Sequence, residues 1–134
     1  MPVLLDTDVA IELLRGNPET LARIAERNDP VFVSPITAAE LYFGAFNSSR
    51  PDENAERVAG FLAEFPEARL TADAARTFGE LKARLRRQSV QIAPMDLLIA
   101  AIALCHDCIL ATGNVRHFRQ IPNLHIENWI RQQP

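Results

Sequence analysis

Three short, strongly apolar runs, separated by segments of helical periodicity, constrain the fold of this chain most. The runs cover residues 3–5, 31–33 and 108–111. Continuous hydrophobic runs with helices between them are typical of parallel strands that are covered on both faces. Two weaker strands are expected near residues 68–70 and 124–126. The sequence therefore predicts an α/β fold, a three-layer α/β/α sandwich around a central parallel sheet of about five strands.

Length and composition predict one domain over residues 1–134. Hydrophobic residues make up 48% of the chain, but the longest strongly apolar run, residues 97–104, is shorter than the roughly 20 residues that span a bilayer. We see no basic leader, so we expect a cytoplasmic protein without a membrane partner. The net charge is −3, yet residues 1–67 carry −7 and residues 68–134 carry +4, which leaves room for a basic face.

Several acidic residues lie where parallel strands would bring them together. Asp6 and Asp8 directly follow the first apolar run, Glu40 lies in the helix expected after the second, and Asp96 begins the helix before the third. Ligands of open α/β sheets bind at the carboxyl ends of the strands. Carboxylates gathered there would suit a divalent cation and phosphodiester hydrolysis. Each also has a structural alternative: Asp6 as a helix cap, Asp96 as a cap or as a first-turn acid that favours the helix dipole, and Glu40 in a capping box that begins at Thr37.

The motifs resemble, in order and over nearly the whole chain, those of PIN-domain proteins, specifically VapC-type ribonuclease toxins of type II toxin–antitoxin modules. Each motif is short, but all of them at this length form a specific signal. The matching stretches are LLDTDV at residues 4–9, SPITAAEL at 34–41, DLLIAA at 96–101, LATGN at 110–114 with Phe118, and IENW at 126–129.

The resemblance implies an endoribonuclease that depends on Mg²⁺ or Mn²⁺ and cleaves RNA, such as tRNA or rRNA, to inhibit translation. Asp6, Glu40 and Asp96 match the acidic core of the motif as catalytic residues and metal ligands. The fourth position of the family is a variable acidic or polar residue, for which Asn114 is the best match. Many relatives have Asp before the Phe, where this chain has His117.

Two further groups of residues follow from the same resemblance. Thr7 and Thr112 are expected to hold carboxylates by hydrogen bonds. Arg116, His117 and Arg119 are candidates for contact with the RNA backbone, with ordinary surface charge as the alternative.

The resemblance also implies a cognate VapB-like antitoxin, and either a homodimer or a toxin–antitoxin hetero-oligomer. Six residues could line an apolar groove for the antitoxin, although plain core packing would also explain them. They are Leu41, Tyr42, Phe43, Phe46, Phe61 and Leu62.

Two other functions compete with this interpretation. The run Asp6-Thr7-Asp8 resembles the D-x-D motif of haloacid-dehalogenase-type phosphotransferases, in which the first Asp is a covalent nucleophile. That chemistry needs a lysine near the phosphate, and the sole lysine, Lys82, lies in the middle of an expected helix. The other alternative is a degenerate PIN fold that only binds a partner.

The pair Cys105 and Cys108 lacks the second pair that a structural zinc site normally needs.

Overall fold

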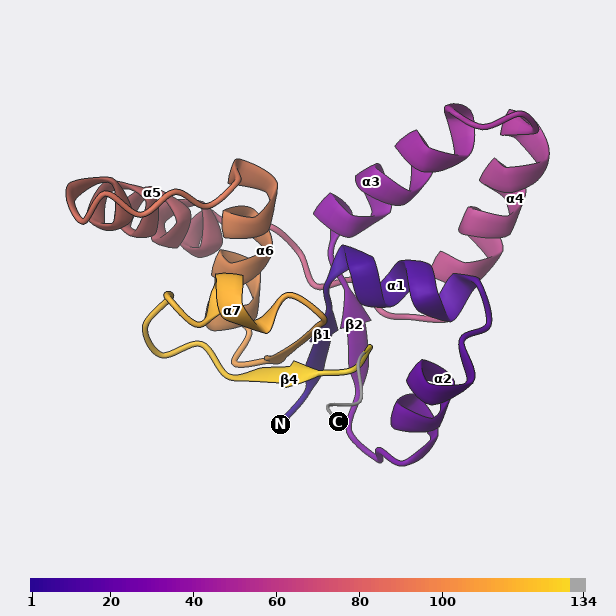
Figure 1. The fold of residues 1–134 in the computed structure, drawn as a ribbon, viewed down its shortest axis with the longest axis horizontal. Coiled ribbons are helices and arrows are strands. Elements are labelled where there is room, and N and C mark those ends of the chain that lie inside the picture. Colours follow the sequence, from indigo (N-terminus) through magenta and orange to yellow (C-terminus); the bar gives the residue numbers. More distant parts are fainter. Residues whose placement is uncertain (131–134) are drawn as a thin grey trace.

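A four-stranded parallel sheet forms the centre of the molecule, seen in the computed structural model of residues 1–130 (Figure 1). The strand order is β2-β1-β3-β4, so the first strand of the chain lies inside the sheet. Leu4 pairs with Phe32 on one side and with Leu110 on the other. The strands are β1 (Val3–Leu5), β2 (Val31–Val33), β3 (Ile109–Thr112) and β4 (Ile126–Asn128).

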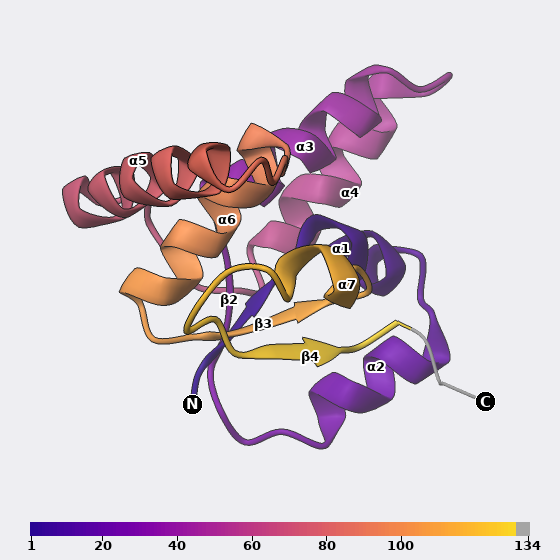
Figure 2. The same cartoon turned by 60° about the vertical axis from the view of Figure 1, so that its left-hand side comes forward.

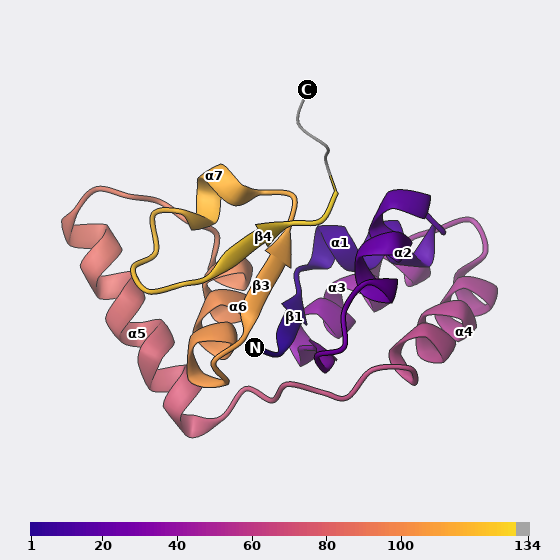
Figure 3. The same ribbon diagram turned by 90° about the horizontal axis from the view of Figure 1, so that it is seen from below.

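Helices cover both faces of this sheet, as the runs of apolar residues predict. In Figure 2, α5 and α6 lie on one side of the strands and α2 lies on the other. Figure 3 shows that α3 and α4 form a pair remote from α5. The helices are α1 (Thr7–Leu14), α2 (Pro18–Ala25), α3 (Pro35–Phe46), α4 (Pro51–Leu62), α5 (Ala72–Arg87), α6 (Pro94–Cys105) and α7 (Val115–Phe118).

The side chains of β1 point alternately to the two faces of the sheet and therefore contribute to two core clusters. Leu4 packs into a cluster with residues of α5 and α6, whereas Val3 and Leu5 pack into a second cluster with α1 and Trp129. All three residues of β1 are completely buried. Successive side chains of a strand point to opposite faces, so a strand buried on both faces must be apolar throughout. The predicted three-layer α/β architecture is confirmed.

Helix α6 is the most deeply buried helix. Its residues 99–103 have no exposed surface, and its sequence is apolar on every side, as expected for a helix inside the core. Three alanines in this stretch, Ala100, Ala101 and Ala103, allow close approach of the neighbouring elements. Because the body of α6 is held by packing, its first turn is fixed relative to the sheet.

The expected number of strands was wrong: within residues 1–130 the sheet has four. Near residues 68–70 there is only an isolated bridge between Val33 and Glu67, continued by a hydrogen bond from the Ala68 N–H to the Val33 carbonyl. Ala68 is buried but Leu70 is 40% exposed, so no apolar face anchors a longer pairing. The last strand forms, two residues later than expected, at Ile126–Asn128.

Smaller differences occur at the ends of helices. Helix α6 begins at Pro94 rather than at Asp96, because proline suits the first helical position. The segment predicted as a loop after β3 contains the short helix α7, held by the completely buried side chain of Phe118. None of the helices within the described residues is long and apolar enough to cross a membrane.

Both cysteines are free thiols: Cys105 is the last residue of α6, and Cys108 lies in the turn between α6 and β3. Asp107 adopts a left-handed conformation there, with φ of 53°, which ends the helix and turns the chain into the sheet. Burial, with a smaller contribution from Asp107, raises the pKa of the Cys108 thiol to about 11. This thiol therefore stays protonated and packs as a small apolar side chain.

Candidate functional site

Asp6 lies at the carboxyl end of β1 and is nearly completely buried, with 4% of its surface exposed. It caps α1, because its Oδ1 accepts a hydrogen bond from the Thr7 N–H at 2.9 Å. Its Oδ2 accepts from the Thr112 hydroxyl, at the end of β3, at 2.7 Å. Capping of α1, the structural alternative for Asp6, thus uses only one carboxylate oxygen of Asp6, and the other oxygen bonds to the neighbouring strand.

The electrostatic environment of Asp6 is unfavourable for a carboxylate. Burial raises its pKa from 3.8 to about 7, with further increases from Asp8 and Asp96 and opposing effects from the hydrogen bonds of Thr112 and Thr7. Desolvation and like charge both disfavour ionisation. The three aspartates therefore form one interacting group, although Asp96 is 90 positions from Asp6 in the sequence.

Asp8 belongs to this group, although it lies outside the three acidic positions assigned from the sequence. Its Oδ2 accepts from the Gly113 N–H at 3.0 Å, while its Oδ1 is buried without a hydrogen-bond partner. Burial is the main reason that its pKa is raised, and Asp96 raises it further. A Cβ at Gly113 would come within 3.0 Å of Asp8 Oδ2, so glycine permits this close approach.

Glu40 lies on α3, half-buried, and accepts a hydrogen bond from the Thr7 hydroxyl. That hydroxyl also lies 3.1 Å from the hydroxyl of Thr37. The capping-box alternative for Thr37 and Glu40 is wrong, because Ser34 caps α3 and accepts from the Thr37 N–H at 3.2 Å. Thr7, which directly follows Asp6 in the chain, therefore connects the Glu40 carboxylate to the end of β1.

Asp96 lies in the first turn of α6 and is not its cap, since Ala93 occupies the cap position without a side-chain hydrogen bond. Its Oδ2 lies 3.3 Å from the Nε2 atom of His117 on α7. The two groups lack the alignment of a hydrogen bond. The residue that reaches Asp96 from the segment after β3 is thus His117.

Asn114 contributes to the site through its backbone. Its N–H donates to the Thr112 hydroxyl at 2.9 Å, and its exposed side chain makes no capping bond to α7. Arg116 and Arg119 are both exposed on or next to this short helix. The chain beyond β3 therefore brings a half-buried histidine and two exposed cations to the rim of the acidic group.

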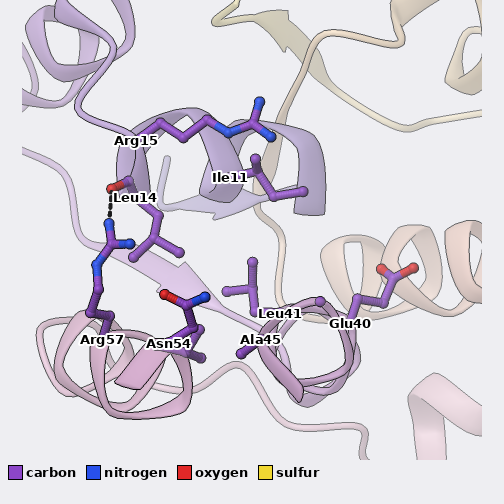
Figure 4. Close-up of a pocket in the computed structure, with 10 residues that line it drawn as sticks. Ile11, Leu14, Arg15, Glu40, Leu41, Ala45, Asn54 and Arg57 are labelled. Atoms are coloured by element: carbon purple, nitrogen blue, oxygen red, sulfur yellow. Dashed lines mark hydrogen bonds between the residues drawn. The ribbon is translucent and has the colours of Figure 1, made fainter. Parts of the chain in front are cut away.

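A groove of about 290 Å³ lies between α1, α3 and α4, and Glu40 is one of the residues that line it (Figure 4). Ile11, Leu14 and Leu41 line it, and Arg57 donates from Nη2 to the Leu14 carbonyl at 3.4 Å. Glu40 lies at the end of the groove away from Arg57.

The six residues expected to form an antitoxin groove divide into three groups. Leu41 lines the groove. Phe43 and Phe46 are exposed by 69% and 58%. The remaining residues, Tyr42, Phe61 and Leu62, pack partly against the core clusters.

Comparison with known proteins identifies the family. The family model of the PIN domain matches residues 3–124. Ribonuclease VapC2 of Rickettsia felis is 30% identical over 132 residues, which cover 96% of this chain and 98% of the relative. The tRNA(fMet)-specific endonuclease VapC of Salmonella typhimurium is 32% identical over 127 residues, which cover 94% of this chain and 96% of the relative.

Solved structures agree with this result. The chain superposes with a TM-score of 0.87 and 30% identity on a chain of VapBC2 from Rickettsia felis bound to a promoter DNA fragment, covering 96% of this chain and 99% of that one. For DNA-bound VapBC from Salmonella typhimurium the TM-score is 0.89 at 31% identity, covering 96% and 98%. The chain therefore belongs to the PIN-domain family. Within it, the chain is a member of the VapC ribonucleases.

The haloacid dehalogenase alternative does not agree with this family. The PIN match begins at residue 3 and includes Asp6 and Asp8. The sole lysine, Lys82, holds its ammonium group 5.7 Å from the centre of the Phe78 ring on α5. The D-x-D run is thus part of the PIN motif.

Nucleases of this family generally depend on a divalent metal ion, and the donor set here is chemically suited to one. Asp6, Asp8 and Asp96 supply the oxygen ligands that such ions prefer, and a cation would relieve their mutual repulsion. Asp8 Oδ1 is a buried oxygen that lacks a donor. Within residues 1–130, no three such groups are already spaced to ligate one ion.

Proposed function

We propose that this chain is a metal-dependent endoribonuclease, the toxin of a type II toxin–antitoxin module, that hydrolyses phosphodiester bonds of tRNA or rRNA and so inhibits translation. The observation that carries the proposal is that the chain which ends and follows β3 contacts all three aspartates: Thr112 and Gly113 bond to Asp6 and Asp8, and His117 lies against Asp96. The ribonucleases and the tRNA-specific endonuclease among its relatives support it. Mg²⁺ or Mn²⁺ is the proposed cofactor, because both accept carboxylate ligands.

Asp6 and Asp96 would hold the ion, with Glu40 completing the site. Such an ion, when bound, supplies a Lewis acid and a bound water of lowered pKa. Glu40 is proposed to accept the proton of the attacking water at its carboxylate, or to hold that water in line with the phosphorus. As the new P–O bond forms, the bond to the leaving ribose oxygen breaks, and that oxygen takes up the proton released by the attacking water, passed on from Glu40 through solvent.

Two threonines would keep the carboxylates in orientation. Thr112 donates to Asp6, and Thr7 donates to Glu40, so each oxygen that is held this way presents its other lone pairs in a defined direction. Asn114 stays a proposed member of the site, connected through its amide to Thr112.

RNA is proposed to enter over α7. Arg116 and Arg119 are exposed there, beside the half-buried His117, and guanidinium groups suit phosphate oxygens. Positive charge at the rim would offset the repulsion between the acidic group and the RNA backbone. This function places the protein in the cytoplasm together with its substrate.

The proposed protein partner is a VapB-like antitoxin, because two of the matching structures are VapBC assemblies. An apolar antitoxin segment would fill the groove beside Leu41, with Phe43 and Phe46 as further exposed contacts. A homodimer or a toxin–antitoxin hetero-oligomer is the proposed assembly.

Cleavage of RNA by the purified chain tests the proposal. Total cellular RNA, tRNA and rRNA are incubated with Mg²⁺, with Mn²⁺ and with EDTA, beside Asp6→Asn and Asp96→Asn. The matched control is Asp73→Asn, an exposed carboxylate in the first turn of α5. We expect metal-dependent cleavage by the unchanged chain and the control, and none by the other two variants. Cleavage that persists in EDTA, or in both site variants, would refute the metallonuclease.

A further inference from the structure

His117 carries a buried nitrogen that no hydrogen bond uses. Its Nε2 atom has almost no exposed surface and lies 3.3 Å from Asp96 Oδ2. The ring is fixed by an edge contact with Phe118, at 5.6 Å between centroids and 85° between planes. The backbone N–H of His117 bonds to the Asn114 carbonyl, and its own carbonyl accepts from Gln120. The nitrogen is thus held toward the acidic group.

Buried polar atoms that lack a hydrogen bond are rare and destabilising, so their location is informative. Within residues 1–130, three buried side-chain nitrogen or oxygen atoms have no hydrogen-bond partner. Two of them, His117 Nε2 and Asp8 Oδ1, belong to the group around Asp96; the third belongs to Arg27. A cation would satisfy both atoms when the imidazole carries its proton on Nδ1, which leaves a lone pair on Nε2.

The separation between His117 and Asp96 suits two ligands of one ion. Neighbouring ligands of an octahedral ion, each about 2.1 Å from the metal, lie about 3 Å apart. The distance here is 3.3 Å between Nε2 and Oδ2. With a protonated imidazole the same separation is that of an ion pair with Asp96, which a metal ion would replace.

We propose that His117 supplies an imidazole nitrogen ligand, beside Asp96, to the divalent ion of this site, so that this chain binds Mn²⁺ in preference to Mg²⁺. Imidazole suits first-row transition ions, whereas Mg²⁺ demands oxygen ligands. The inference rests on the proposed function, because it assigns a further ligand to the same centre. His117, which replaces the acidic residue of many relatives, would then act as a metal ligand itself.

Pulsed electron paramagnetic resonance of bound Mn²⁺ tests the ligand directly. Metal-free protein is loaded with Mn²⁺ alone, and nitrogen-14 modulation from a coordinated imidazole is recorded. We expect modulation in the unchanged chain, its loss in His117→Gln, and its retention in the control His125→Gln, an exposed histidine before β4. Calorimetry should show the ratio of Mn²⁺ to Mg²⁺ affinity falling about tenfold in His117→Gln.

The outcomes separate this inference from the proposed function. Absence of nitrogen modulation in the unchanged chain, or its persistence in His117→Gln, would overturn the inference and leave an oxygen-only ribonuclease, provided that Asp96→Asn still abolishes Mn²⁺ binding and cleavage. Mn²⁺ binding that does not depend on Asp96 would overturn both. The measurement on the unchanged chain needs no variant, so it decides even where His117→Gln folds poorly.

Discussion

Replacing Asp6 by Asn should stabilise the metal-free protein at pH 8 and slightly destabilise it at pH 4. The unfolded chain releases the Asp6 proton near 3.8, whereas the folded protein retains it up to about 7. Above pH 7 the folded protein must hold a carboxylate in a buried, negatively charged site. The free energy of unfolding of the unchanged chain therefore falls as pH rises across this interval. Asparagine fills the same space without a charge.

The magnitude follows from the two pKa values of Asp6. The rise from 3.8 to about 7, at about 1.36 kcal/mol for each tenfold change in proton affinity, corresponds to about 4 kcal/mol. Asparagine keeps one acceptor oxygen, so one of the bonds from Thr7 and Thr112 is weakened at a cost of about 1 kcal/mol. The net gain at pH 8 is then about 3 kcal/mol.

Urea denaturation in EDTA at pH 4, 6 and 8 measures this difference. Asp73→Asn serves as the control, because its exposed carboxylate should change the free energy of unfolding by less than about 0.5 kcal/mol at any of these pH values. An Asp6→Asn variant that is less stable than the unchanged chain at pH 8, or whose difference does not vary with pH, would refute the reasoning. Adding Mn²⁺ at pH 8 should stabilise the unchanged chain and have little effect on the variant.

Three further predictions concern the surroundings of the acidic group. Thr7→Val removes the hydroxyl that holds the carboxylate on α3, so cleavage should slow at least about tenfold while the melting temperature stays nearly constant. Gly113→Ala places a Cβ 2.7 Å from Ile130 Cδ1, and urea denaturation should show a loss of about 1–3 kcal/mol. Removing the guanidinium groups of both Arg116 and Arg119 should make the binding of single-stranded RNA less dependent on salt. In a catalytically inactive variant, the slope of log K against log salt should fall by about 1.4. An unchanged slope would show that neither arginine contacts the RNA backbone.

The layered fold was predictable because its buried strands are marked by their composition. The runs at residues 3–5, 31–33 and 108–111 are apolar on both faces, and only a covered parallel sheet accommodates them. The edge of the sheet was less predictable. Residues 67–70 contribute one bridge rather than a strand, because pairing there depends on whether Leu70 finds a cover, which is a tertiary property.

The site was only partly predictable for a similar reason. Sequence spacing indicated Asp6, Glu40 and Asp96, but could not separate ligands from caps. Asp96 is excluded as a cap only by the observed start of α6, which places Ala93 at the cap position. The close contact of Asp8 with the chain after β3 depends on a backbone approach at residue 113. Glycine there was the available signal.

The orientation of the His117 side chain could not be predicted from the order of motifs along the chain. The segment after β3 was expected to be a loop, in which Asn114 was the preferred match for the fourth site position and His117 was the other candidate. One turn of helix, anchored by Phe118, turns the histidine toward Asp96 and leaves the Asn114 side chain exposed. The burial of the Phe118 ring decides this orientation, and a short sequence motif does not predict it.

The position of β1 inside the sheet has a consequence for the synthesis of the protein. The hydrogen bond from Thr112 to Asp6 spans 106 residues, and β1 has no β3 to pair with until residue 112 has been made. A growing chain therefore carries Asp6 from the start without the strand that seats it. Fragments that end before residue 112 lack β3 and the hydrogen bond from Thr112, so we expect the proposed active site to form only in a nearly complete chain.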